Sequence, residues 1–274
     1  MGLNTQSKKN LPRTPFERSE KQCVSSEARK LSMPQNLDYL QNLSHFFLLF
    51  IKKTLPLTKN KIMAATIEAT LSSPITAEAY LKMQRSGPRE LAPKYELINQ
   101  NLVLMAGASR NHVKINKNLI YTLEHQVRTH HLNHEVSAND MRVVSHVESK
   151  NYFYPDLVVV ENKPYFEDEA LQDTLMNPTI VIEVLSNSTE ALDRGDKFRS
   201  YRLTKSVKEY ILVSQYTPFV EHHYLGDNGR WQLDDYTEGV IPLKTAPFEL
   251  SLEDIYFKVD FNDPIANKDP EPVI

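Results

Sequence analysis

Two carboxylates occupy positions where carboxylates are unusual. Glu183 lies in the middle of the apolar run IVIEVL, and Asp156 opens the run DLVVV directly after a proline. Asp and Glu are rarely buried unless they are paired or bind a metal. Neighbouring strands lie about 4.8 Å apart, so the two acids could reach one point if their strands pair. Convergent carboxylates suit Mg²⁺, with Mn²⁺ as a substitute. The alternative is two edge-facing acids whose heads are solvated or ion-paired.

A cationic segment follows these acids. Residues 190–203 read EALDRGDKFRSYRL, and Asp193, Lys197 and Tyr201 fall at i, i+4 and i+8, on one face of a predicted helix. A lysine over a metal-bound phosphate could stabilise developing charge or hold the attacking water. The alternative is a surface pair of Asp193 and Lys197. Gly195 is costly within a helix, which suggests that two backbones approach closely there.

Helices and strands must alternate to position these residues. Apolar periodicity and capping residues predict helices over residues 75–83, 110–131, 190–203 and 252–257. In the longest of them, the apolar positions at helical spacing are Val113, Ile120, Leu123 and Val127, with Ile115 and Leu119 beside them. A hairpin is predicted over 95–105, and strands over 135–144, 156–161, 179–185, 209–214, 219–225 and 231–236. The order indicates an α/β sandwich whose apolar strands are covered on both faces.

The charge of the chain is unevenly distributed. The 274 residues carry a net charge of −3, but residues 1–62 carry +7 and residues 63–274 carry −10. We therefore predict a basic, disordered extension over 1–62, a domain over 63–260 and a frayed tail over 261–274. Translation from Met63 would remove the extension.

Composition excludes several classes of protein. The hydrophobic and charged fractions are those of an ordinary globular chain, so collagen, a coiled-coil rod and a wholly disordered chain are excluded. The single cysteine excludes an internal disulfide framework and a cysteine zinc finger, and it favours the cytoplasm. The apolar run over residues 43–51 is shorter than the roughly 20 residues of a membrane span, so no membrane association is expected.

Histidines and a second acidic run could also do chemistry. The histidines at 130, 131 and 134 and the acids at 167–169 are interpreted as solvated rather than metal-binding. His222 and His223 point to opposite faces of a strand, so at least one is expected to face solvent.

Seven stretches, taken together in order, carry a family resemblance. They are YELI (95–98), MAGAS (105–109) followed by His112, NDMRV (139–143), YPDLVVV (154–160), NPTIVIEVLS (177–186), DRGDKFRSYR (193–202) and EYILVSQ (209–215). Over about residues 76–257 the chain resembles the Uma family of the PD-(D/E)xK nuclease superfamily. This resemblance implies a restriction-endonuclease-like core, a mixed central β-sheet flanked by helices in the order α-β-β-β-α-β.

The resemblance also implies a reaction and its residues. The expected activity is Mg²⁺-dependent hydrolysis of phosphodiester bonds, with DNA as the partner. Asp156 and Glu183 match the metal-binding acids, and Glu96 matches an outer acidic ligand. The motif lysine would stand at Leu185, and Lys197 on the following helix matches its displaced position. His112, Asp140 and Tyr201 are accessory candidates. A homodimer would suit cleavage of both strands.

Two alternatives to this enzyme stay open. Leu185 at the motif position is compatible with a catalytically inactive module that binds nucleic acid or a protein, and an unrelated acid-rich metal hydrolase is the other. The −10 charge of residues 63–274 is unusual for a nucleic-acid binder. The dense basic stretch over 194–205 lies beside the predicted site, where its local charge can outweigh the net value.

Overall fold

The computed structural model describes residues 74–86, 93–105, 107–145 and 150–269. The predicted extension, its apolar run and the alternative start at Met63 lie outside them. Within the described part of the chain, no helix is long and apolar enough to cross a membrane.

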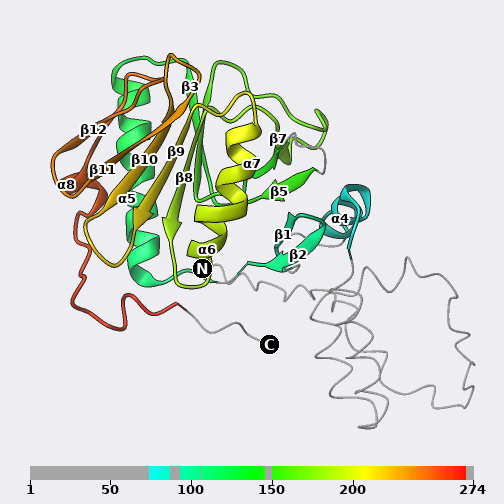
Figure 1. The fold of residues 1–274 in the computed structure, drawn as a ribbon, viewed down its shortest axis with the longest axis horizontal. Helices are drawn as coiled ribbons and strands as arrows, with labels where there is room; N and C mark the ends of the chain where they lie inside the picture. Colours follow the sequence, from blue (N-terminus) through cyan, green and yellow to red (C-terminus); the bar gives the residue numbers. More distant parts are fainter. Residues whose placement is uncertain (1–73, 87–92, 106, 146–149, 270–274) are drawn as a thin grey trace, which may run out of the picture. The chain divides into compact units, whose positions relative to one another are not determined.

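Two larger sheets and one small hairpin form the β structure (Figure 1). The six-stranded sheet has the order β11 (Trp231–Tyr236), β10 (Val220–Leu225), β9 (Glu209–Ser214), β8 (Ile180–Leu185), β6 (Leu157–Glu161), β3 (His134–Ala138). The five-stranded sheet has the order β2 (Asn101–Leu104), β1 (Tyr95–Ile98), β5 (Asn151–Phe153), β4 (Arg142–Ser145), β7 (Thr174–Leu175). The hairpin pairs β12 (Val240–Pro242) with β13 (Glu249–Ser251).

Helical segments connect and cover these sheets. In chain order they are α4 (Ala77–Gln84), α5 (Arg110–Thr129), α6 (Glu190–Leu192), the π-helix η1 (Asp193–Lys197), α7 (Phe198–Leu203) and α8 (Leu252–Ile255). Thr76 and Ser109 cap α4 and α5 by accepting from backbone N–H groups three residues on, as their sequence positions predict. Thr189, the candidate cap of the next helix, makes no such side-chain bond.

The six-stranded sheet is covered on both faces, as its apolar strands require. Strands β8 and β9 run parallel, and the other pairs of this sheet run antiparallel. Side chains alternate along β6, so Leu157 packs in the core cluster of α5 and α8, whereas Val158 packs with Tyr201 of α7. The sheet is therefore mixed and flanked by helices (Figure 1), in agreement with the predicted α/β architecture.

The predicted hairpin over 95–105 is confirmed as β1 and β2. Its two turn residues, Asn99 and Gln100, have positive φ angles of 50° and 66°. Two-residue hairpin turns of this kind need positive φ at both central positions, which Asn tolerates well and Gln does less often. This turn sets the register in which Glu96 pairs with Val103, and it thereby places Glu96 on its strand.

The structure corrects three expectations about elements. The single strand predicted over 135–144 is two strands in different sheets, because the chain turns at Asn139, whose φ is +37°. The helix predicted over 190–203 is interrupted by η1. Val113, assigned to the apolar face of the long helix, is 56% exposed, since the face that α5 buries is centred on Ile115 and Leu119.

Candidate active site

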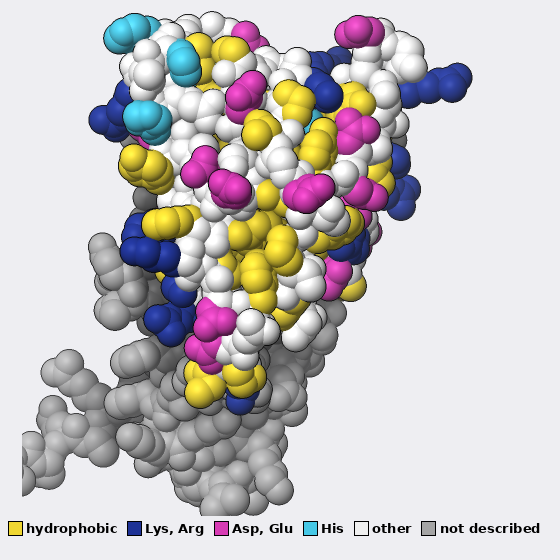
Figure 2. All heavy atoms as spheres, turned by 90° about the vertical axis from the view of Figure 1, so that its left-hand side faces the viewer, with side chains coloured by type: hydrophobic (Ala, Val, Ile, Leu, Met, Phe, Trp, Pro, Cys, Tyr) yellow, Lys and Arg dark blue, Asp and Glu magenta, His cyan; other side chains and the backbone are white. Residues whose placement is uncertain are grey.

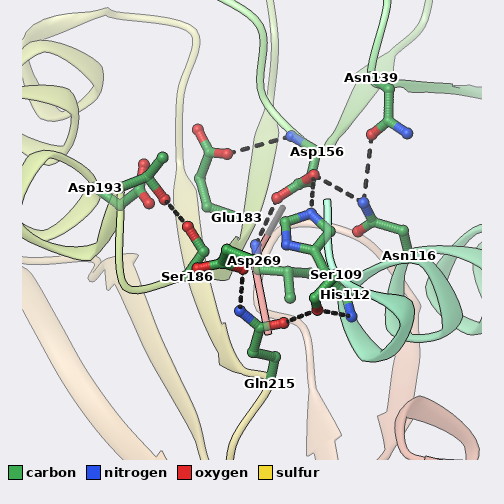
Figure 3. A network of polar contacts seen from close by, with 12 residues as sticks. Ser109, His112, Asn116, Asn139, Asp156, Glu183, Ser186, Asp193, Gln215 and Asp269 are labelled. Atoms are coloured by element: carbon green, nitrogen blue, oxygen red, sulfur yellow. Dashed lines mark hydrogen bonds and ion pairs between the residues drawn. The ribbon is translucent and has the colours of Figure 1, made fainter. Parts of the chain in front are cut away.

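Asp156 and Glu183 are neighbours because β6 and β8 pair antiparallel. Their register joins Leu157 to Ile182, and the next position along places Asp156 beside Glu183. The backbone N–H of Asp156 donates to Glu183 Oε2 at 3.2 Å, and the N–H of Val184 donates to Asp156 Oδ2 at 2.8 Å. Each strand thus holds the acid of the other (Figure 3). The predicted convergence of the two strands is present in the structure.

Two side chains of α5 hold the second oxygen of Asp156. His112 Nε2 lies 2.7 Å from Asp156 Oδ1, and Asn116 Nδ2 donates to the same oxygen at 2.7 Å (Figure 3). Burial alone would raise the pKa of Asp156, but the charge of His112 and these hydrogen bonds outweigh it and lower that pKa. Burial opposes the charged form of His112, yet the hydrogen bond that His112 donates to Asp156 and the charge of Asp156 raise the pKa of His112 above its ordinary value. Asp156 is therefore an ionised carboxylate held on two sides.

Lys197 lies among three carboxylates on the opposite side of Glu183. Its Nζ is 3.0 Å from Glu96 Oε1, 3.0 Å from Asp193 Oδ1 and 3.4 Å from Glu183 Oε1. All four side chains are at most 5% exposed. The predicted i, i+4 pair of Asp193 and Lys197 is present, but it is buried, so the alternative of a surface pair is wrong.

These buried charged groups shift one another's pKa values. Burial lowers the pKa of Lys197, but the charges of Glu183, Glu96 and Asp193 outweigh it and hold that pKa well above the ordinary value. Burial raises the pKa of Glu183 well above its ordinary range, against the opposing charge of Lys197. Burial likewise raises the pKa of Glu96. One lysine does not neutralise three carboxylates in a dry environment, so this cluster favours binding a proton or a cation.

The π-helix sets the place of Lys197. Asp193 begins η1 and Lys197 ends it, so the turn that carries both is wider than an α-turn. Gly195 lies within this turn, and a Cβ built at Gly195 would have nothing within 4 Å among the described residues. The close approach of backbones inferred from this glycine is therefore wrong.

The other candidates are placed differently. Glu96 Oε1 accepts from the backbone N–H of Tyr154 at 2.9 Å, which fixes its carboxylate beside Lys197. Tyr201 is fully buried one turn beyond Lys197, and its hydroxyl has no hydrogen-bond partner among the described residues. Asp140 is not among the buried acids: it lies on the exposed turn after β3 and pairs with Lys94. The structure thus gathers every candidate except Asp140.

The donor chemistry at Asp156 and Glu183 fits a hard cation. Across the described ranges, no three His, Cys, Asp or Glu side chains form a ready group for a metal ion. Mg²⁺ does not need such a group, because it keeps several waters and is bound through one or two carboxylates together with substrate phosphates. Asp156 and Glu183 would supply those two carboxylates.

Asn116 is a site residue that the sequence interpretation missed. It is 4% exposed, and its amide bridges Asp156 and Asn139. The signal was present, because an asparagine four residues after His112 lies on the same helical face as the histidine. A polar residue on the side of α5 that packs inward indicates a buried polar partner.

Three histidines outside the site contact other side chains of the fold. His222 is fully buried and pairs with Glu209, whereas His223 is partly buried with its ring 4.4 Å from that of Phe198. His222 and His223 thus lie on opposite faces as expected, and the side chain of His223 is only partly open to solvent. The ring of His134 packs edge-on against Phe248.

Comparison with known proteins identifies a family that this chain matches. A sequence model of the Uma2 family, described as "Putative restriction endonuclease", matches residues 77–254. Two similar proteins come from Synechocystis sp. (strain ATCC 27184 / PCC 6803 / Kazusa). Uncharacterized protein sll1609 is 33% identical over 161 residues, which are 59% of this chain and 86% of that protein. Uncharacterized protein slr1290 is 29% identical over 189 residues, 66% of this chain and 91% of that protein.

One solved structure has the same fold. It is the crystal structure of "a putative nuclease belonging to DUF820" from Anabaena variabilis ATCC 29413, with a TM-score of 0.54 and 16% identity. The match covers 67% of this chain and 98% of that one. The predicted mixed sheet flanked by helices, a restriction-endonuclease-like fold, is therefore confirmed.

Proposed function

The chain belongs to the Uma2 family of restriction-endonuclease-like proteins, and from this premise we propose that it is a metal-dependent endonuclease that hydrolyses phosphodiester bonds in DNA. One observation carries the proposal. Asp156 and Glu183 are adjacent on paired strands, and Lys197 lies against Glu183. Two carboxylates and a lysine at one point are the donor set that metal-assisted phosphodiester hydrolysis needs.

Each residue has a separate role in this proposal. Asp156 is fixed by His112 and Asn116, so its carboxylate is already oriented before substrate arrives. Glu183 shares its two oxygens between the Asp156 N–H and Lys197. Lys197 supplies positive charge beside the scissile phosphate and orients the attacking water. Mg²⁺ bound by the two acids would polarise the phosphate and lower the pKa of a bound water.

Surface charge helps to place the substrate. Figure 2 shows one face of the described residues, where acidic side chains surround a central apolar area and Lys and Arg lie toward the edges. A DNA backbone that crossed this face would meet the carboxylates around the apolar area, which is unfavourable. Exposed cations on α7 and after it, Arg199, Arg202 and Lys205, offer phosphate contacts near the site.

Nicking of plasmid DNA tests the proposal. The full-length protein is incubated with supercoiled plasmid and Mg²⁺ or Mn²⁺, beside Glu183→Gln and Lys197→Met. We expect the parent to nick, and each variant to be slower by a factor of about 100 or more, because each loses a group that acts on the developing charge. Chelation of the metal should abolish nicking by the parent.

Matched controls separate chemistry from folding. Glu135→Gln and Lys163→Met change an exposed acid and an exposed lysine outside the site, and both should nick as the parent does. Circular dichroism confirms that each variant is folded. If the parent fails to nick with either metal, or if all variants nick equally, the enzyme assignment is wrong. A folded, inactive parent that still binds DNA would instead identify a binding module.

A further inference from the structure

A stripe of exposed side chains follows α5 away from the candidate active site. Val113, Lys117, Tyr121 and His125 succeed one another at intervals of four residues, and all four are exposed. Val113 is 56% exposed and Tyr121 is 70% exposed. Residues four apart lie on one helical face, so the stripe is continuous. Its apolar members are not explained by the core, which α5 contacts through its other side.

Three members of the stripe, Val113, Lys117 and Tyr121, line a pocket of about 860 Å³. Apolar groups line most of it, chiefly Met105, Val113, Ile120, Tyr121 and Tyr154. His112, Asn116 and Asp156 also line it, so the pocket opens directly beside the proposed phosphodiester site. Ligand pockets are commonly apolar cavities of this size with a few polar groups that fix orientation.

Two side chains that line the pocket each have a buried polar atom without a partner among the described residues. Asn116 Oδ1 and His112 Nδ1 are buried, and neither has a hydrogen-bond partner among the described residues. The other polar atom of each side chain, Asn116 Nδ2 or His112 Nε2, forms a hydrogen bond with Asp156. The two side chains are therefore fixed in place with one hydrogen-bonding atom each left unused. Unpaired buried polar atoms are costly, and a ligand that hydrogen-bonds to them removes that cost.

The rim of the pocket is aromatic and cationic. The ring of Tyr121 stacks on His125, with centroids 5.9 Å apart and planes within 10°. Lys117 and Lys94 also line the pocket, and Lys94 Nζ lies 5.9 Å from the centre of the Tyr154 ring. A flat aromatic platform with nearby lysines suits a planar ring attached to a phosphate backbone.

We propose that this pocket takes an unpaired nucleobase of the substrate strand, stacked on Tyr121 and hydrogen-bonded to Asn116 and His112. The inference rests on the proposed function in that it takes nucleic acid as the substrate. A base in the pocket would anchor its strand so that the neighbouring phosphate lies at Asp156. A base within a duplex is stacked and paired, so it must leave the helix or come from a single strand.

Binding without metal tests the pocket independently of cleavage. Anisotropy of a fluorescent single strand of mixed sequence is measured in EDTA with the full-length protein, and again with an abasic strand of equal length. We expect the parent to bind the strand with bases about tenfold more tightly, a ratio typical of stacking on one aromatic side chain. Tyr121→Ala should lose most of this preference, whereas Tyr121→Trp should retain it.

A second exposed tyrosine provides the control. Tyr165 is 57% exposed and does not line the pocket, so Tyr165→Ala should keep the full preference for bases. If the parent shows no preference, or if Tyr121→Ala keeps it, the inference is wrong. A parent that nicks plasmid without a base preference contradicts the pocket alone. A parent that does not nick but shows a Tyr121-dependent preference supports the pocket and contradicts the enzyme.

Discussion

At the scale of single residues, the candidate site contains more acid than base. Glu96, Glu183 and Asp193 surround Lys197, and Asp156 faces His112 on the other side of the strand pair. Buried ion pairs add little net stability, because desolvation offsets their attraction. Their arrangement is therefore better explained by function than by folding. The surplus negative charge suits the divalent cation that we propose for this site.

Replacing Lys197 with methionine should destabilise the protein. The variant leaves three buried carboxylates without their cation, which costs about 3–5 kcal/mol near neutral pH. The cost should shrink toward acid, because burial already raises the pKa values of Glu183 and Glu96, and their protonation removes the repulsion. Urea unfolding of parent and variant at mildly acid and mildly alkaline pH measures this difference. An equal loss of stability at both would show that the carboxylates are not the cause.

At the scale of elements, Glu209 ties three segments together. It begins β9, pairs with His222 of β10, and accepts from the backbone N–H groups of Lys244 and Thr245 at 3.0 and 2.7 Å. It is fully buried. Burial raises the pKa of Glu209, but the hydrogen bonds from His222 and Thr245 outweigh it and lower that pKa. The carboxylate thus fixes the β12–β13 connection to the main sheet.

Glu209→Gln should therefore lower stability in a pH-dependent way. A carboxylate whose pKa is lowered by folding stabilises the protein above its unfolded pKa of about 4.3, and this contribution is lost as the pH falls through the folded value. The variant should lose about 2 kcal/mol at neutral pH, as expected for hydrogen bonds to a charged group. The gap from the parent should close below about pH 4. Denaturant titrations across this range measure it, and a gap that widens toward acid contradicts the role.

The sequence predicted the elements with strong patterns and missed those defined by long-range contact. Strands β8 and β9 are continuous apolar runs, and their patterns locate them to within a residue. Strands β5 and β7 are only three and two residues long, and they form by pairing with distant segments. No local pattern marks such strands. The division of residues 135–144 between two sheets depends on the turn at Asn139, which hydrophobic alternation does not reveal.

The site was predictable to a similar degree. Asp156 and Glu183 were recognisable because carboxylates are costly inside apolar strands. Lys197 was recognisable as a cation at helical spacing from Asp193, and the family resemblance added its match to the motif lysine. Its closeness to Glu183 depends on how α6, η1 and α7 cross the sheet. The same holds for Asn116, whose bond to Asp156 depends on the packing of α5 against β6. No local sequence pattern indicated that the side chain of Asp140 would be exposed.

At the scale of the whole molecule, the positions of the charged side chains matter more for DNA binding than the net charge. Residues 63–274 carry −10, yet much of the described acid lies in buried clusters or in ion pairs. An acid and a cation that pair already cancel in the net charge, so the repulsion that a DNA backbone meets depends on where the unpaired charges lie. Lys94 and Lys117 line the pocket, where a phosphate backbone would pass.

Salt dependence of DNA binding should report these pocket lysines. For a single strand, the logarithm of the affinity falls with the logarithm of the salt concentration by about 0.7 for each phosphate contact. Lys117→Ala and Lys94→Ala should each reduce the slope by about that amount, whereas Lys163→Ala should leave it unchanged. Anisotropy titrations at several salt concentrations give the slopes. Equal slopes for all three variants would place the DNA elsewhere.

The π-turn between α6 and α7 has a consequence for the length of the chain. A π-turn holds one residue more than the α-turn that would otherwise span the same segment. Gly195 lies within this turn, at a position where a Cβ would have nothing within 4 Å among the described residues. The turn can therefore be viewed as the mark of a single inserted codon. A relative without that codon would wind α6 and α7 as one regular helix, and the side chain at the position of Lys197 would be rotated away from Glu183. In comparing members of the family, a gap of one residue here would be as informative as the loss of the lysine itself.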